Sequence, residues 1–101
     1  WVKAAGCRRA ALVGHNAHFD LNFLMNAVKR CDLKDFPFHS FTCFDTATLG
    51  ALFYHETVLA RLVKAAGLSF DLRQAHGARY DTQKTAEFFC TLLNQTTPLL
   101  P

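Results

Sequence analysis

The chain has 101 residues, half of them apolar, and it carries 11 Lys and Arg against 8 Asp and Glu, with five His. This length allows at most one compact domain, and the apolar content excludes a disordered chain. No run of about 18 apolar residues occurs, which excludes a membrane-spanning helix and predicts a soluble protein; the net charge of +3 is too small to identify a nucleic-acid-binding protein.

The first predicted elements are a strand and a helix. Residues 10–14 are apolar at consecutive positions and end in Gly14, which is typical of a parallel strand covered on both faces. From Ala17 to Cys31 the apolar residues recur at helical spacing, and Asn16 is placed to cap the first turn. A site is expected where this strand ends.

A break at residues 32–37 precedes a second predicted strand around residues 41–44, and Asp45 or Thr46 would cap the helix that follows. Helical spacing resumes in three stretches: residues 47–53, 58–66 and 78–94. Gly67 supplies a left-handed end to the second stretch.

Two strands that each lead into a helix predict an α/β chain with sites at the carboxyl ends of the strands. Two strands make a poor sheet, so further strands are expected before Trp1, which is not an initiator Met. The four cysteines include no Cys-x-x-Cys pair. Reduced core thiols in a cytosolic protein are therefore expected.

Three residues could perform chemistry together. Asp20 lies on the first turn of a helix, His76 lies in a loop, and Asp81 lies in the first turns of the late helix. Carboxylates that hold divalent ions, beside a histidine that takes a proton from water near neutral pH, suit metal-assisted cleavage of a phosphodiester. Taken singly, such an Asp more often complements a helix dipole, and a lone loop histidine is more often structural.

The segment Gly14-His15-Asn16-Ala17-x-Phe19-Asp20 resembles the second motif of the DEDD exonucleases. His76-x-x-x-x-Asp81 resembles the third motif of their DEDDh branch, and the stretch from Val2 to about Asn94 is similar to the ribonuclease T family of that branch. The resemblance implies a partial ribonuclease H-like fold and two magnesium ions per site. It also implies a cytoplasmic homodimer that trims the 3′ ends of single-stranded RNA and DNA, with transfer RNA end turnover and stable RNA maturation among its tasks.

The resemblance also implies roles for individual residues. Asp20 and Asp81 would be metal ligands, and His76 would be the general base. Phe19 and Phe41 would stack terminal bases. Lys3 and Arg9 would grip RNA that enters the partner subunit's site. Stacking tolerates many base sequences and is worth about 1–3 kcal/mol per base. Lys3, Arg8 and Arg9 form a small basic cluster that could meet phosphates, although they could equally be a solvated surface.

Most of the ten Phe must be core residues, and packing would account for Phe23, Phe44, Phe88 and Phe89.

One departure from the family pattern stands out. The first motif of the family, Asp-x-Glu, is absent, because no Asp in the chain is followed two residues later by Glu. Two carboxylates cannot readily hold two magnesium ions in octahedral geometry, so the isolated chain is expected to have little or no activity. Residues 1–95 are interpreted as the C-terminal part of one exonuclease domain, and residues 96–101 as an unassigned tail.

Three alternatives remain open. A module that binds single-stranded nucleic acid would keep the phenylalanines and lose catalysis. A zinc site could use His15 and His18 with Cys31 or Cys43, although neither Cys has ligand spacing. A helix-rich structural domain would leave the histidine and carboxylates of the two motifs with packing roles only.

Overall fold

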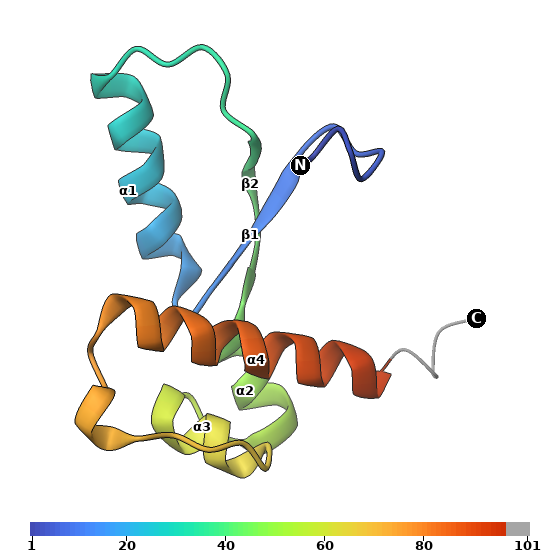
Figure 1. Cartoon of the computed structure of the whole chain (residues 1–101), viewed down its shortest axis with the longest axis vertical. Coiled ribbons are helices and arrows are strands. Elements are labelled where there is room, and N and C mark those ends of the chain that lie inside the picture. The colour runs from blue at the N-terminus through green and yellow to red at the C-terminus, as the bar shows by residue number, and fades with distance from the viewer. Residues whose placement is uncertain (97–101) are drawn as a thin grey trace. The chain divides into compact units, whose positions relative to one another are not determined.

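The computed structural model describes residues 1–96, and the chain divides into two units at Asp45 (Figure 1). The first unit contains strand β1 (Ala10–Gly14), helix α1 (Ala17–Arg30) and strand β2 (Phe38–Asp45). The two strands pair in parallel, with α1 as the connection between them. The predicted α/β class is confirmed, as is the order strand, helix, strand.

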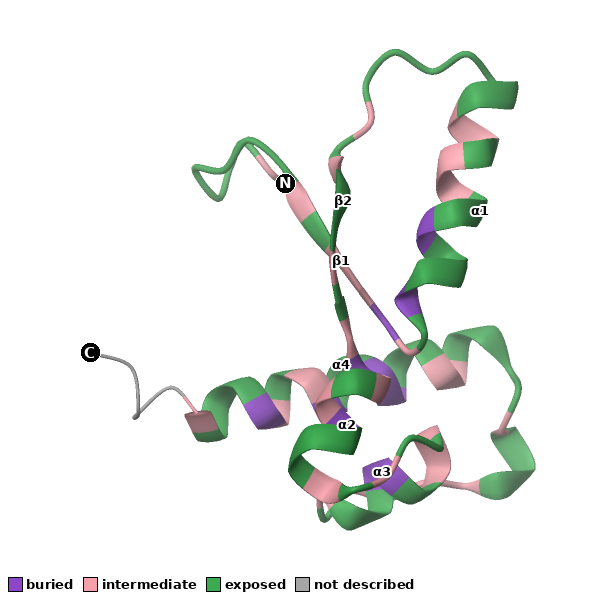
Figure 2. Ribbon diagram, turned by 180° about the vertical axis from the view of Figure 1, so that it is seen from behind, coloured by how far each residue is buried: buried purple, intermediate pink, exposed green. Residues whose placement is uncertain are grey.

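Burial in the first unit is limited. Only Ala17 and Leu21 of α1 are buried, while Ala11 in the middle of β1 is exposed (Figure 2). The expectation that this strand is covered on both faces is therefore wrong for the described residues. A parallel sheet is covered on both faces when helices pack on each side, and the first unit contains a single helix.

The N-terminus of α1 is capped by a residue distant in the sequence. Asn16 occupies the predicted N-cap position at a left-handed φ of 60°, but its side chain makes no capping hydrogen bond. Instead, the carboxylate of Asp45 accepts hydrogen bonds from the backbone N–H groups of Asn16 (3.0 Å) and Ala17 (3.1 Å). Because Asp45 pairs with Gly14 at the carboxyl ends of the parallel strands, its carboxylate can reach the start of the helix that follows β1.

Replacing Asp45 with Ala in the complete protein is expected to lower the free energy of unfolding by about 1–3 kcal/mol, because two N–H groups lose a charged acceptor. Urea denaturation measures this change. Asp35→Ala is the matched control, since Asp35 is exposed and has no hydrogen bond or ion pair within residues 1–45. Equal destabilisation by both substitutions would contradict the capping role.

The second unit is helical. It contains α2 (Thr46–Tyr54), α3 (Leu59–Ala65), the short 3-10 helix η1 (Leu72–Gln74) and α4 (Ala78–Thr96). Gly67 follows α3 at a φ of 82°, as the helix-stop pattern predicts. No sequence pattern predicts η1. Of the tail assigned from sequence, Thr96 ends α4, and residues 97–101 lie outside the described residues.

The core of the second unit joins α3 to α4. Its fully or almost fully buried members are Leu62, Val63, Phe88 and Leu92. Partly buried apolar side chains pack against them: Leu49, Tyr54, Leu59, Ala66, Leu68 and Phe70. The predicted packing role of Phe88 is confirmed.

Two of the phenylalanines assigned to packing are surface residues. Phe23 is 70% exposed and Phe44 is 47% exposed, so their assignment to the core is wrong, while Phe89 is half-buried. The physical reason is the same as for β1: within residues 1–45 one helix and two strands enclose little volume.

The thiols are unpaired, but they are not core residues. Cys7, Cys31 and Cys90 are exposed and Cys43 is half-buried, so the expected core location is wrong. Cys7 lies in the N-terminal turns and Cys31 immediately follows the end of α1, positions that face solvent. In residues 1–96, no helix combines the length and the apolar character needed to cross a membrane.

Candidate functional site

Asp20 lies in the first turn of α1, and its carboxylate folds back over the end of β1. A Cβ atom placed on Gly14 would lie 2.7 Å from Oδ2 of Asp20 and 3.2 Å from the Cα of Ala17. Glycine at position 14 therefore leaves the space that the Asp20 carboxylate occupies. Asp20 itself is exposed, so a cation can approach its carboxylate.

Asp81 lies in the first turn of α4, where its backbone N–H donates to the carbonyl of Gly77 at 2.9 Å. Its Oδ1 atom is buried and has no hydrogen-bond partner among the described residues. A buried carboxylate oxygen without a partner costs free energy, and a bound cation is one of the few groups that can satisfy it. This oxygen is therefore suited to hold a metal.

His76 lies in the loop between η1 and α4 at a φ of 68°. The left-handed conformation costs a non-glycine residue about 1–2 kcal/mol, and it persists only where the surrounding structure imposes it. The side chain is exposed, and within residues 46–96 the imidazole has no hydrogen-bond or ionic partner. Its nitrogens are available to exchange a proton.

The second unit brings His76 and Asp81 to the same end of α4, and the first unit places Asp20 at the carboxyl end of β1. No group of three or more His, Cys, Asp or Glu side chains able to hold a metal is found within residues 1–96. The zinc alternative through His15 and His18 gains no support.

Both phenylalanines expected to stack bases stand out from the surface. Phe19 is 62% exposed beside the ring of His18, and Phe41 is 77% exposed with its ring edge-to-face with His39 at 4.3 Å. The Nδ1 atom of His39 accepts hydrogen bonds from the N–H groups of Phe41 (3.3 Å) and Thr42 (3.0 Å).

These bonds explain how β2 presents Phe41. The pairing of β2 with β1 is irregular between Phe38 and Cys43, which is where His39 takes up two backbone donors. A bulge of this kind redirects side chains locally. Sequence reasoning missed His39, because the signal is a break in strand register that no local pattern reveals.

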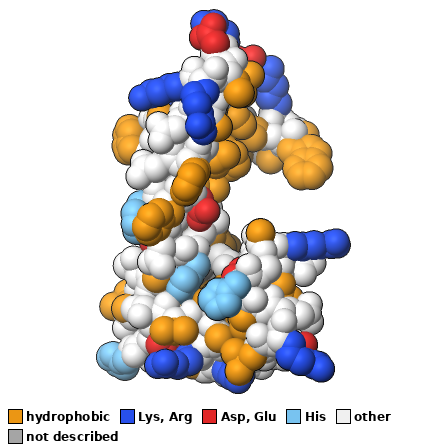
Figure 3. All heavy atoms as spheres, turned by 90° about the vertical axis from the view of Figure 1, so that its left-hand side faces the viewer, with side chains coloured by type: hydrophobic (Ala, Val, Ile, Leu, Met, Phe, Trp, Pro, Cys, Tyr) orange, Lys and Arg blue, Asp and Glu red, His pale blue; other side chains and the backbone are white. Residues whose placement is uncertain are grey.

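The basic residues are also exposed. Lys3 borders a hollow of about 480 Å³, whereas Arg9 is not among the residues that line it. The lining residues are Val2, Lys3, Arg8, Lys34, Asp35, Phe36 and Pro37. Figure 3 shows basic and hydrophobic side chains exposed together on the part of the molecule that includes α1. Lys34 was missed because the fold, not the sequence spacing, brings it beside the N-terminal residues.

Comparison with known proteins identifies the family. The RNase T family model, described as exonuclease, matches residues 4–89, a range that includes both motifs. The chain belongs to the RNase T exonuclease family. Ribonuclease T of Vibrio cholerae serotype O1 is 61% identical over 93 residues, which are 92% of this chain and 42% of that relative. The chain thus spans about two fifths of the length of that curated relative.

Members of the RNase T exonuclease family generally use divalent metals, and two features of this chain fit such ions. The unpartnered Oδ1 of Asp81 is a hard oxygen donor without a competing hydrogen bond. The Asp20 carboxylate lies against Gly14, where the absence of a Cβ atom leaves room for it. The donor set is partial, since no third acidic or imidazole ligand joins either carboxylate within residues 1–96.

Proposed function

We propose that the complete protein, of which this chain is a part, removes nucleotides from the 3′ ends of single-stranded RNA and DNA by hydrolysing phosphodiester bonds. The buried, unpartnered Oδ1 of Asp81 beside the loop that carries His76 is the observation that carries the proposal. Membership of an exonuclease family sets the reaction class. Transfer RNA end turnover and 3′ maturation of stable RNAs are the proposed tasks.

In the proposed mechanism of the complete protein, Asp20 and Asp81 would supply two of the carboxylates that hold two magnesium ions, and an Asp-x-Glu motif outside residues 1–101 would supply the others. Such ions, when bound, stabilise the charge that develops on the attacking and leaving oxygens of the phosphodiester. His76 takes the proton from the attacking water, a task that suits a histidine near neutral pH. Its exposed ring and lack of a partner within residues 46–96 leave it accessible for that transfer.

Residues 1–95 are proposed to be the C-terminal part of a single exonuclease domain, with little or no activity alone. The missing Asp-x-Glu motif and the partial donor set support this. The complete protein is proposed to act as a cytoplasmic homodimer, in which Lys3 and Arg9 grip RNA that enters the partner subunit's site. Four unpaired thiols are compatible with a reducing compartment.

The decisive experiment compares the complete protein with its Asp81→Asn variant on a 5′-labelled single-stranded RNA over a magnesium titration. The variant is expected to lose on the order of 100-fold in rate and to need more magnesium, because a neutral amide is a poorer ligand than a carboxylate. Asp32→Asn is the control, since Asp32 is exposed and is not among the residues proposed to bind metal or RNA. Tight RNA binding without cleavage by the unmodified protein would favour the binding-module alternative instead.

The stacking role of the exposed rings gives a graded prediction. Phe19→Ala and Phe41→Ala should each weaken binding of a single-stranded oligonucleotide by about 1–3 kcal/mol, the value of one stacked base. Fluorescence anisotropy without magnesium measures binding in the absence of cleavage. Phe23→Ala is the matched control, because Phe23 lies one helical turn after Phe19 on α1 and is similarly exposed. If all three variants lost the same affinity, the three rings would contribute to binding as a general apolar surface and not by specific stacking on bases.

A further inference from the structure

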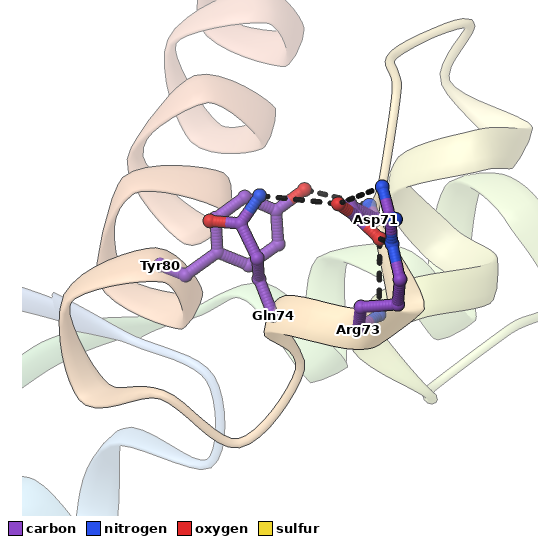
Figure 4. A network of polar contacts seen from close by, with 4 residues as sticks. All are labelled: Asp71, Arg73, Gln74 and Tyr80. Carbon is purple, nitrogen blue, oxygen red and sulfur yellow. Dashed lines mark hydrogen bonds and ion pairs between the residues drawn. The ribbon is translucent and has the colours of Figure 1, made fainter.

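The loop that carries His76 is closed by one hydrogen bond at its base. The backbone N–H of Asp71 donates to the hydroxyl of Tyr80 at 2.7 Å, which joins two residues nine positions apart (Figure 4). His76 lies between these two residues, and Asp81 directly follows Tyr80. The bond therefore ties the loop of the proposed base to the helical turn that carries a proposed metal ligand.

Contacts on the other side of Tyr80 hold the incoming chain against α4. The Tyr80 ring packs edge-to-face on Phe70 at 5.2 Å, and the Nζ atom of Lys84 lies 5.6 Å from the centre of the same ring. Lys84 is buried and donates a hydrogen bond to Oγ of Ser69 at 3.4 Å. Ser69 and Phe70, which directly precede Asp71, are thus held to the same face of α4 as Tyr80.

The loop is also ordered from within. The carboxylate of Asp71 accepts hydrogen bonds from the backbone N–H (3.0 Å) and Nε (3.2 Å) of Arg73 and from Nε2 of Gln74 (3.2 Å). Hydrogen bonds from the Arg73 side chain, and then from Gln74, lower the pKa of Asp71, so the carboxylate stays charged at more acidic pH than an ordinary Asp does. η1 is therefore capped at its start by Asp71, five residues before His76.

His76 depends on this backbone framework. Its φ of 68° is unfavourable for a side chain with a Cβ atom, and its imidazole has no partner within residues 46–96 that could fix it. The position of the ring is consequently set by the loop backbone. A looser loop would let residue 76 relax toward ordinary φ values and carry the imidazole away.

We infer that Tyr80 is a positioning residue for His76, with its hydroxyl closing the loop on the N–H of Asp71. The inference rests on the proposed function, in which His76 takes the proton from water. It assigns a role in turnover to a hydroxyl that need not touch substrate or metal. The apolar ring of Tyr80 would remain in place when only the hydroxyl is removed.

The test is Tyr80→Phe in the complete protein. The expected result is a kcat lower by about tenfold at unchanged KM for a single-stranded RNA, since misplacing a catalytic group slows the chemical step more than binding. Hydrogen exchange of the Asp71 amide should accelerate by about tenfold or more, because the amide loses its acceptor. Tyr54→Phe is the matched control, as Tyr54 packs on Phe88 but its hydroxyl has no hydrogen bond within residues 46–96.

Each outcome decides the inference. Faster exchange of the Asp71 amide with an unchanged kcat would overturn the inference, and so would a raised KM alone or an unchanged exchange rate. All three results would leave the proposed nuclease function intact. Absence of nucleotide release by the unsubstituted protein would instead refute the proposed function. Should Tyr80→Phe fail to fold, Asp71→Pro removes the N–H that donates to the Tyr80 hydroxyl, and Asp71→Ala is its control because it loses the same carboxylate but keeps the N–H. A kcat at least threefold lower in Asp71→Pro than in Asp71→Ala at constant KM supports the inference, and equal kcat values refute it.

Discussion

Replacing His76 with Asn in the complete protein is expected to reduce the rate of nucleotide release by about 10²- to 10⁴-fold, the contribution of a general base to such a step. Asn is the informative replacement because it tolerates left-handed backbone conformations, so the φ of 68° can be retained while the base is lost. The free energy of unfolding should change little, since the imidazole is exposed and unpartnered within residues 46–96.

Single-turnover release of the terminal nucleotide measures this effect without a contribution from product dissociation. His55→Asn is a closely matched control, because His55 is also exposed and has a left-handed φ of 54° in the same unit. The control should keep full activity. Unchanged release by the His76 variant, or an equal loss in both variants, would remove His76 from the role of base.

The elements that could be predicted from sequence are those whose signal is local. The strand at residues 10–14 has the same bounds in the structure, and the helix from Ala17 ends within one residue of its expected position. Periodicity also predicted α4, which extends two residues beyond the expected range. In each case, apolar spacing along the chain indicates the type and the bounds of the element.

The features that sequence did not predict depend on residues far apart in the chain. The cap of α1 comes from Asp45, 29 residues after Asn16, because parallel pairing places the two strand ends together. Phe23 and Phe44 lie on element faces suited to packing, but burial requires a covering layer that residues 1–45 do not supply. Periodicity marks a face as apolar without saying whether anything covers it.

The candidate site also has some features with a local sequence signal and others that depend on the fold. The motifs indicated the chemical types at positions 20, 76 and 81, because the proposed reaction requires those types. The buried unpartnered oxygen of Asp81 and the closure of the loop by Tyr80 depend on three-dimensional placement. Both are properties of the packing around the residues that are proposed to perform the chemistry, and spacing does not encode them.

Gly14→Ala should lower kcat of the complete protein by on the order of 100-fold, the cost of misplacing a reacting group by about 1 Å. The new Cβ atom would lie 2.7 Å from Oδ2 of Asp20, which is too close for either atom to stay in place. The carboxylate is the more mobile of the two, so it is expected to move while the fold persists. The contact of 3.2 Å with the Cα of Ala17 requires a smaller backbone adjustment.

Gly67→Ala provides the contrast. A Cβ atom there would meet nothing within 4 Å, but the φ of 82° is strained for alanine, so this variant should lose stability by about 1 kcal/mol and keep its kcat. Urea denaturation and the steady-state rate of nucleotide release, measured on both variants, therefore distinguish a loss of stability from backbone strain from a loss of turnover through a displaced side chain.

A double variant shows whether Gly14 acts through Asp20. If the substitution at position 14 slows turnover only by displacing that carboxylate, then Gly14→Ala combined with Asp20→Asn should be no slower than Asp20→Asn alone, because two changes in one interaction are not additive. Multiplicative losses would instead mean that Gly14 affects turnover by a separate route, such as the path of the chain into α1. The first outcome would make the absence of a Cβ atom at the end of β1 a requirement for placing Asp20, the proposed metal ligand.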